Sequence, residues 1–207
     1  MRKKSKLVYG VGINDADYNV TEHAMVDGKW KIVRICPFYR VWSHMLERCC
    51  SDKLQNRYPT YKGCSVVEEW KTFSKFKAWM EQQDWKGKQL DKDLLFHGNK
   101  IYGPDHCVFV DRTVNSFMTE STSTRGEWPI GVAWHKNRSK FDSHCNNPFT
   151  KKLEHLGLFM CPNEAHQVWL KRKRELAHEL AALQTDPRVA KALIDRYNVE
   201  VYNPLHE

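Results

Sequence analysis

Residues 89–119 read QLDKDLLFHGNKIYGPDHCVFVDRTVNSFMT, and this stretch decides the fold that the sequence predicts. Residues 89–96 favour a strand, and His97-Gly98-Asn99 and Gly103-Pro104 supply turn residues. Residues 107–110 favour a second short strand, because β-branched and aromatic side chains fit a pleated surface. Residues 112–118 favour a helix. The stretch therefore predicts a strand, a loop, a strand and a helix.

Two oxygen-bearing side chains in this stretch suit a divalent cation. Asp91 lies on the first predicted strand and Asn115 on the predicted helix. A unit of this shape can hold such side chains on opposite sides of one ion, and hard cations such as Mg²⁺ prefer oxygen ligands. We therefore expect Asp91 and Asn115 to bind Mg²⁺ or Mn²⁺.

The same stretch resembles the HNH, or His-Me finger, endonucleases of phages and mobile introns. In that family a strand ends in Asp-His, a loop Asn holds the hairpin in shape, and an Asn or His on the helix completes the metal site. Asp91, Asn99 and Asn115 stand at the matching positions. The departure is Lys92, which stands where the family has its general-base His. The resemblance implies metal-dependent hydrolysis of phosphodiester bonds in DNA.

Lys92 leaves the identity of the general base open. Lysine is a poor base near neutral pH because its unperturbed pKa is about 10.4, and the flanking Asp91 and Asp93 favour the ammonium form. We expect Lys92 to hold the scissile phosphate, or to replace a base whose work is done by water activated at the metal. His97 and His106 are the next candidates for the base. The alternative is that Lys92 is a solvated strand residue.

The composition indicates a basic chain that can fold. Of its 207 residues 41% are hydrophobic and 28% are charged, and the aromatic residues number eight Trp, eight Tyr and nine Phe, so a core can form. The net charge of +8 favours a polyanionic partner, which we expect to be double-stranded DNA. A soluble protein that is basic without such a partner is the alternative. We expect a monomer or weak dimer without a small-molecule cofactor.

No stretch of the sequence predicts export or membrane insertion. The basic start MRKKSKLVYGVGIND is followed by no apolar signal-peptide core, and no run of about 18 apolar residues occurs. The seven cysteines are expected to be reduced thiols in the cytoplasm, that of the host cell if the protein is phage-encoded. Structural zinc is not expected, because Cys-x-x-Cys is absent. A zinc site would have to use Cys36, Cys64 and Cys107 with a His.

Before the central stretch, the pattern of apolar residues predicts a hairpin and two helices. Residues 29–35 alternate polar and apolar side chains after the turn pair Asp27-Gly28. Apolar side chains recur at three- and four-residue spacing over residues 37–50 and again over residues 70–80. Three segments resemble the region that precedes the finger in phage proteins of this kind: WSHMLERC, YPTYKGCSVVEEW and FSKFKAWM. The resemblance therefore covers residues 36–118.

After residue 119 the composition changes. The polar run 120–126 is expected to be a linker, which separates residues 1–119 from a second domain at 127–185 and a C-terminal helix and tail at 186–207. Three short strands are expected at 129–134, 140–145 and 155–160, followed by a helix over 163–183. The expected fold class is α+β: a lead-in of helices and strands packed on a ββα unit, then a three-stranded sheet with a long helix.

The phrases GVAWHKNRSKFDSHC, LGLF and EAHQVWLKRKREL resemble the Apetala-type DNA-binding domain of plant transcription factors and phage homing nucleases. In that family the sheet lies in the major groove of DNA. By position, the resemblance implicates as DNA contacts Arg125, Trp134, His135, Lys136, Arg138 and Lys140. Trp134 is equally well interpreted as a core residue. The cationic run 171–174 is typical of a solvated helix face, and phosphate contact is its less favoured interpretation.

The function that these patterns favour is a phage-type DNA endonuclease that uses one divalent metal ion and is targeted by its C-terminal domain. Its catalytic site would contain Asp91, Lys92, Asn99 and His97. A catalytically degenerate HNH-like protein that binds DNA as a regulator is the alternative. An RNA-binding or RNA-processing protein is the third interpretation, although the sequence contains no recognisable RNA-binding motif.

Overall fold

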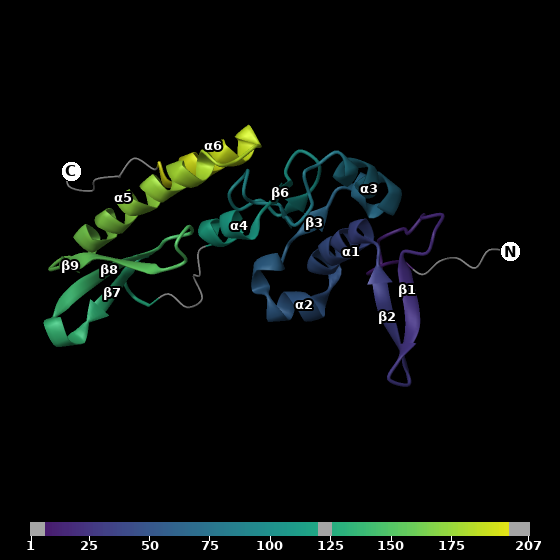
Figure 1. The fold of residues 1–207 in the computed structure, drawn as a ribbon, viewed down its shortest axis with the longest axis horizontal. Coiled ribbons are helices and arrows are strands. Elements are labelled where there is room, and N and C mark those ends of the chain that lie inside the picture. Colours follow the sequence, from purple (N-terminus) through teal and green to yellow (C-terminus); the bar gives the residue numbers. More distant parts are fainter. Residues whose placement is uncertain (1–6, 120–125, 199–207) are drawn as a thin grey trace. The chain divides into compact units, whose positions relative to one another are not determined.

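The computed structural model of the chain describes residues 7–119 and 126–198. The chain divides into two compact units, residues 1–111 and 112–207 (Figure 1). Both units contain helices and strands, so the expected α+β class is confirmed. In the described part of the chain, no helix combines the length and the apolar character that crossing a bilayer requires.

The first unit begins with a hairpin of two antiparallel strands, β1 (Thr21–Val26) and β2 (Lys29–Ile35). The turn residues Asp27 and Gly28 have φ of +52° and +71°, as a two-residue hairpin turn requires. Figure 1 shows the hairpin projecting from the start of the next helix. The alternation of the sequence thus predicted this element correctly.

Three helices follow, α1 (Pro37–Cys50), α2 (Asp52–Arg57) and α3 (Phe73–Glu81), with short 3₁₀ turns at Pro59–Tyr61 and Glu68–Lys71. Trp42 on α1 is fully buried, and its indole Nε1 donates to the carbonyl of Trp70 at 2.7 Å, which satisfies the indole N–H inside the core. The core of this unit is built mainly from Trp42, Met45, Leu46, Trp70, Phe73, Phe76, Met80, Leu90, Tyr102 and Phe109.

Two small sheets complete the first unit. Strand β3 (Ser65–Val66) pairs in parallel with β5 (Ile101–Tyr102), and β4 (Gln89–Asp91) pairs antiparallel with β6 (Val108–Val110). The strand expected over residues 89–96 is therefore only three residues long. It ends at Asp91 because that side chain accepts hydrogen bonds from the backbone N–H groups of Asp93 and Leu94, which turns the chain out of the sheet.

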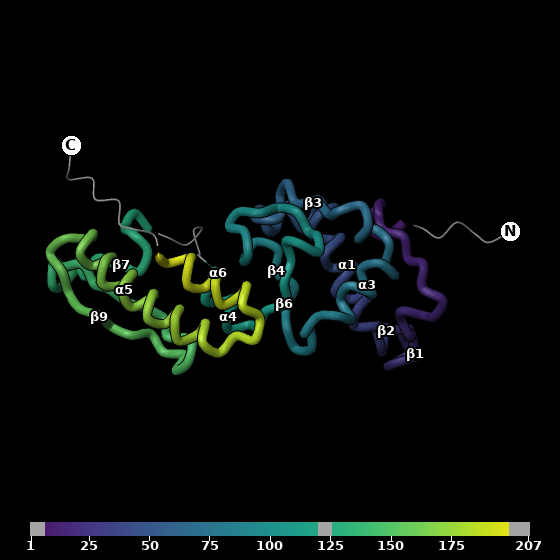
Figure 2. Tube along the Cα trace, turned by 90° about the horizontal axis from the view of Figure 1, so that it is seen from above, coloured from purple at the N-terminus to yellow at the C-terminus, as the bar shows by residue number. Residues whose placement is uncertain are grey.

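The second unit begins with α4 (Arg112–Met118) and contains an antiparallel sheet in the order β7 (Val132–His135), β8 (Lys140–Asn146), β9 (Leu153–Phe159). The long helix α5 (Pro162–Ala181) lies along this sheet, and α6 (Pro187–Tyr197) packs beside it (Figure 2). Proline stands at the start of both helices, where its missing N–H costs no hydrogen bond. The expected three strands and long helix are present.

Helix α4 is anchored to the last two helices. The carbonyl of Phe117 accepts from Lys173 Nζ at 2.9 Å and from the Tyr197 hydroxyl at 3.2 Å, and the rings of Phe117 and Tyr197 meet edge to face. The division between the units accordingly falls before α4, whereas the sequence suggested a boundary after residue 119.

Candidate functional site

The end of β4 places a carboxylate in a partly desolvated position. Asp91 Oδ1 accepts from Asp93 N at 2.9 Å and from Leu94 N at 2.7 Å. Burial raises the pKa of the Asp91 carboxyl above its usual value, the neighbouring Asp93 carboxylate raises it further, and the two backbone donors and Lys92 act in the opposite direction. A cation beside Asp91 would relieve this unfavourable negative charge.

Lys92 directly follows Asp91 and is buried, with only 6% of its surface exposed. Its Nζ lies 3.3 Å from Asp93 Oδ2. The interpretation of Lys92 as a solvated strand residue is therefore wrong: β4 has already ended, and the side chain turns inward to an acidic partner. A buried ammonium group that keeps its charge needs such compensation.

Asn99 holds the loop between β4 and β5. Its Nδ2 donates to the carbonyls of Lys92 at 2.7 Å and Ile101 at 2.8 Å, and its Oδ1 accepts from Ile101 N at 3.1 Å. The preceding Gly98 has φ of +78°, a conformation that glycine adopts without a steric penalty. These bonds fix the position of the Lys92 backbone relative to β5.

The two histidines near this loop have different environments. His97 is exposed on the loop. His106 is half-buried with its ring 5.7 Å from that of Phe96, and its Nδ1 is buried without a hydrogen-bond partner in the described structure. His97 is therefore better placed than His106 to reach a substrate in solvent.

Arg48 approaches the same region from α1 and was not among the site residues that the sequence predicted. Its Nη1 lies 3.5 Å from the Leu90 carbonyl and 3.5 Å from the Tyr102 hydroxyl, and its guanidinium lies over the Tyr61 ring. The spacing of Arg48 from Met45, one helical turn earlier on the buried face, was the available indication.

Asn115, the second expected metal ligand, is half-buried on α4 and belongs to the second unit, whereas Asp91 belongs to the first. Their joint binding of an ion stays a prediction. Carboxylate and amide oxygens have the chemistry that Mg²⁺ or Mn²⁺ prefers. Among residues 7–119 and 126–198, no three or more His, Cys, Asp or Glu side chains are arranged to hold a metal ion. Cys36, from the zinc set, instead lies 3.4 Å from the Tyr18 hydroxyl.

The turn between β7 and β8, together with the ends of the two strands beside it, carries most of the residues expected to contact DNA. Lys136, Arg138 and Lys140 are exposed, and none of them forms an ion pair with another described residue. His135 is half-buried and pairs with Lys140 across the strands. Arg125 lies outside the described residues. The turn therefore presents three closely spaced cations to solvent.

Trp134 is 45% exposed, so it is not a core residue. It pairs with Phe141 across the strands, and the two rings meet edge to face with centroids 4.8 Å apart. Trp128 packs on Phe141 at the same separation. The Trp134 ring thus contacts Phe141 while much of its surface remains open to solvent.

A carboxylate on the sheet was not anticipated by the sequence analysis. Asp142 on β8 is nearly buried, His144 Nε2 lies 3.3 Å from its Oδ2, and His155 Nε2 lies 3.0 Å from its Oδ1, although that second contact lacks the alignment of a hydrogen bond. The alternation Asp142-Ser143-His144 places the outer two on one face of the strand and was visible in the sequence. Both imidazole rings therefore lie beside this carboxylate.

The cationic run 171–174 is mainly structural. Arg172 binds Glu154 on β9 through Nε at 2.7 Å and Nη2 at 3.1 Å, and Arg174 Nε donates to the Tyr197 carbonyl at 2.5 Å. Lys173 binds the Phe117 carbonyl and lies over its ring. Of the four residues, only Lys171 is exposed. The side chains of Arg172, Lys173 and Arg174 are engaged within the protein, so neither of the two interpretations of this run, a solvated helix face or a phosphate contact, describes them.

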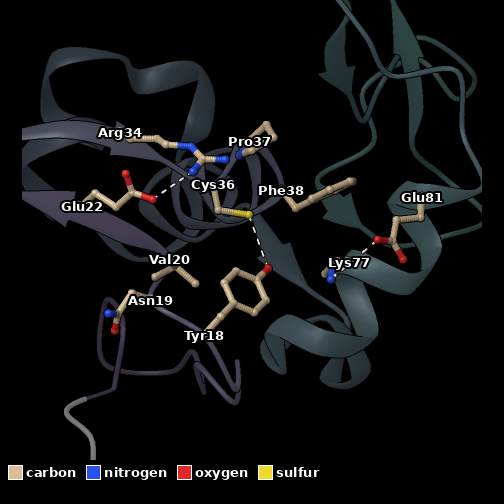
Figure 3. Close-up of a pocket in the computed structure, with 10 residues that line it drawn as sticks. All are labelled: Tyr18, Asn19, Val20, Glu22, Arg34, Cys36, Pro37, Phe38, Lys77 and Glu81. Atoms are coloured by element: carbon tan, nitrogen blue, oxygen red, sulfur yellow. Dashed lines mark hydrogen bonds and ion pairs between the residues drawn. The ribbon is translucent and has the colours of Figure 1, made fainter.

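Each unit also contains a depression. In the first unit a cavity of about 520 Å³ lies at the start of α1 (Figure 3), and its charged side chains are paired: Arg34 with Glu22 at 2.9 Å and Lys77 with Glu81 at 3.6 Å. Burial and then Cys36 raise the pKa of Tyr18 there to about 12. The second unit contains a groove of about 1110 Å³.

Comparison of the chain with protein families, curated proteins and solved structures found no match.

Proposed function

We propose that this protein is a DNA endonuclease that hydrolyses phosphodiester bonds with the help of one divalent cation. The observation that supports the proposal most strongly is the loop after β4. There a partly desolvated Asp91 carboxylate ends a strand, and Asn99 ties the following loop together through Lys92 and Ile101. This is the arrangement that the resemblance to HNH endonucleases implies for these two residues.

In this proposal the residues have separate roles. The Asp91 carboxylate would hold Mg²⁺ or Mn²⁺, with the Asn115 amide as the second ligand that the resemblance implies, and such an ion would stabilise the negative charge that builds up on a phosphate during an in-line displacement. Asn99 positions the loop and does not react. Lys92 compensates the charge of Asp93 and contributes positive potential at the phosphate. His97, which is exposed, deprotonates the attacking water.

The exposed cations of the second unit support the DNA partner. Lys136 and Arg138 on the turn and Lys140 at the start of β8 have no acidic partners in the described structure, and contacts of this kind to phosphates supply affinity independent of sequence. These residues would bring the catalytic loop to a duplex.

A second function is favoured by one specific observation. The residue at the position of the family's general base is a buried lysine 3.3 Å from Asp93, and an ammonium group held in this way cannot accept a proton. A catalytically inactive DNA-binding protein, acting as a regulator, therefore remains the competing proposal. Both functions predict binding of DNA, and only the first predicts cleavage.

A plasmid-nicking assay with Mg²⁺ or Mn²⁺ distinguishes the two. The informative variant is Asp91→Asn, because the amide oxygen can still accept from Asp93 N and Leu94 N while the charge for the metal is lost. We expect nicking by the wild-type protein and a loss on the order of a hundredfold or more in the variant, since the metal supplies several kcal/mol of charge stabilisation.

Asp105→Asn is the matched control, because Asp105 is an exposed carboxylate in the same unit, and its nicking rate should equal that of the wild type. Absence of nicking with either metal ion, or equal nicking by Asp91→Asn, would refute the nuclease proposal. DNA binding without nicking would favour the regulator.

A further inference from the structure

The groove of the second unit has aromatic walls. It runs between α4, the segment after residue 126, the β7 and β8 strands and the first half of α5, with a volume of about 1110 Å³. The aromatic side chains that line it are Phe117, Trp128, Trp134 and Trp169. Trp134 is the most exposed of these. Phe117 and Trp169 are buried, so the flat apolar surface that a ligand with π-faces of its own can reach belongs mainly to Trp134 and the half-buried Trp128.

Every charged side chain that lines the groove among the described residues is a cation. Its lining includes Arg112, Lys151 and Lys173, whereas no Asp or Glu of the described residues lines it. Lys173 is already bonded to the Phe117 carbonyl, but Arg112 and Lys151 are exposed and form no ion pair with a described residue. The cavity beside α1 differs in this respect, since each of its cations has a carboxylate partner. The groove is therefore complementary to an anionic ligand.

We propose that this groove binds a segment of single-stranded DNA, with unpaired bases stacked on Trp134 and phosphates held by Arg112 and Lys151. Bases within a duplex have both faces covered by their neighbours, so only unpaired bases can stack on a tryptophan. Aromatic surfaces combined with cations and no carboxylates are the features that single-strand binding requires. The choice of DNA over RNA rests on the function proposed above, and the single-stranded character rests on the groove itself.

The polar residues of the groove suit a ligand of variable sequence. Asn146 is exposed and its amide can donate to and accept from base edges, and Thr113 and Ser116 supply hydroxyl groups on α4. Asn147, by contrast, is already engaged with Glu154 through Nδ2 and with backbone N–H groups through Oδ1. Few directed hydrogen bonds are thus available, so stacking and charge would dominate.

This proposal gives Trp134 a role different from that of the neighbouring turn. Trp134 lines the groove. Lys136 and Arg138 on the exposed turn and Lys140 at the start of β8 do not line it. Two surfaces of the second unit would then bind two forms of DNA: the turn contacts duplex phosphates and the groove holds an unpaired strand. Substitutions at the two surfaces should have separable effects.

The test is fluorescence anisotropy with a labelled oligothymidylate of about 12 nucleotides, a length within the range of known single-strand sites, in EDTA so that no cleavage occurs. We expect the full-length protein to bind it and Trp134→Ala to weaken binding by about five- to a hundredfold, the loss typical of one base–aromatic stack. Trp134→Phe retains a stacking face and should restore most of the affinity. Arg112→Ala combined with Lys151→Ala should weaken binding and reduce its salt dependence.

Trp30→Ala is the matched control, because Trp30 is 70% exposed on the hairpin of the first unit and does not line the groove. Its affinity for the oligothymidylate should be unchanged, and circular dichroism melts establish that each variant is folded. The proposal is overturned if the oligothymidylate does not bind, if folded Trp134→Ala binds as well as wild type, or if a polyglutamate peptide competes equally. Equal or tighter binding of oligouridylate overturns the choice of DNA.

The outcome is independent of the nuclease assay. Single-strand binding without plasmid nicking would support this inference and count against the endonuclease. Nicking without single-strand binding would support the endonuclease and overturn this inference.

Discussion

Gly131, at the start of β7, shows how one residue sets the shape of the groove. Its φ is +82°, and a Cβ atom placed on it would lie 2.1 Å from Trp169 Cδ1. Trp169 itself is held by stacking on His166, whose Nδ1 lies 2.8 Å from the Ile130 carbonyl. The Trp169 indole is therefore held in place next to Gly131. The close approach of α5 to the residue before β7 requires a residue without a side chain.

Gly131→Ala should destabilise the protein by roughly 2–4 kcal/mol, because the left-handed conformation and the overlap with Trp169 each cost on the order of 1–3 kcal/mol. Urea unfolding followed by circular dichroism measures the change. Gly126→Ala is the control: a Cβ there meets nothing within 4 Å and its φ is not positive, so stability should change by less than about 0.5 kcal/mol. Equal stability of the two variants would contradict the packing described.

At the scale of elements, β9 is tied to α5 by one carboxylate. Glu154 accepts two hydrogen bonds from Arg172, at 2.7 and 3.1 Å, and one from Asn147 Nδ2 at 2.7 Å. The Arg172 side chain, followed by Asn147, lowers the pKa of Glu154 to about 2. Since the folded-state pKa lies below the unfolded one, this contribution to stability is complete above about pH 4.5 and is lost as the pH falls towards 2.

Glu154→Gln should lower the free energy of unfolding by about 1 kcal/mol at pH 7, a modest value because the side chain is about one-quarter exposed and solvent screens the pair. The difference from wild type should shrink below about pH 4.5 and disappear near pH 2. Denaturant unfolding at a series of pH values tests this. Glu179→Gln, at 3.7 Å from Arg172 and more exposed, should have little effect at any pH. A difference that persists undiminished at pH 2 would exclude the ionised pair as its cause.

At the scale of the whole molecule, some of the positive charge lies where no carboxylate of the described residues balances it. The net charge is +8, yet many cations of the described part are neutralised by ion pairs, such as Lys31 with Asp27 and Lys88 with Asp84. The turn at Lys136–Arg138 and the following Lys140 are not neutralised in this way. Electrostatic affinity for duplex DNA should therefore come from this turn more than from the average surface.

Replacing Lys136, Arg138 and Lys140 with Ala together should lower duplex affinity and reduce the slope of log K against log salt by roughly 2–3, because each phosphate contact contributes about 0.9. Anisotropy titrations of a labelled duplex in EDTA, over a range of NaCl concentrations, measure this slope. The charge-matched control replaces Lys53, Lys62 and Lys75, three exposed lysines of the first unit. Equal slopes for the two triple variants would show that the turn has no special contact with DNA.

The sequence by itself determined those elements whose cause is local. The hairpin follows from alternation around Asp27-Gly28, α1 from its apolar spacing after Pro37, and α6 from Asp186, whose side chain accepts from Arg188 N as an N-cap. The loop bonds of Asn99 were also expected, since the resemblance assigned that residue to holding the hairpin. Neighbours along the chain are enough to specify each of these features.

Only the tertiary structure decided what each charged side chain does. The alternative interpretation of Lys92 as a solvated strand residue failed because the side chain is buried against Asp93. Arg172 was expected on a solvated face but binds Glu154, eighteen positions away on β9. The groove, which no carboxylate of the described residues lines, likewise brings together Arg112, Trp134 and Lys151 from separate elements. Charge compensation depends on distance in space, and residues far apart in the sequence come close only when the core closes, so periodicity along the chain could not reveal them.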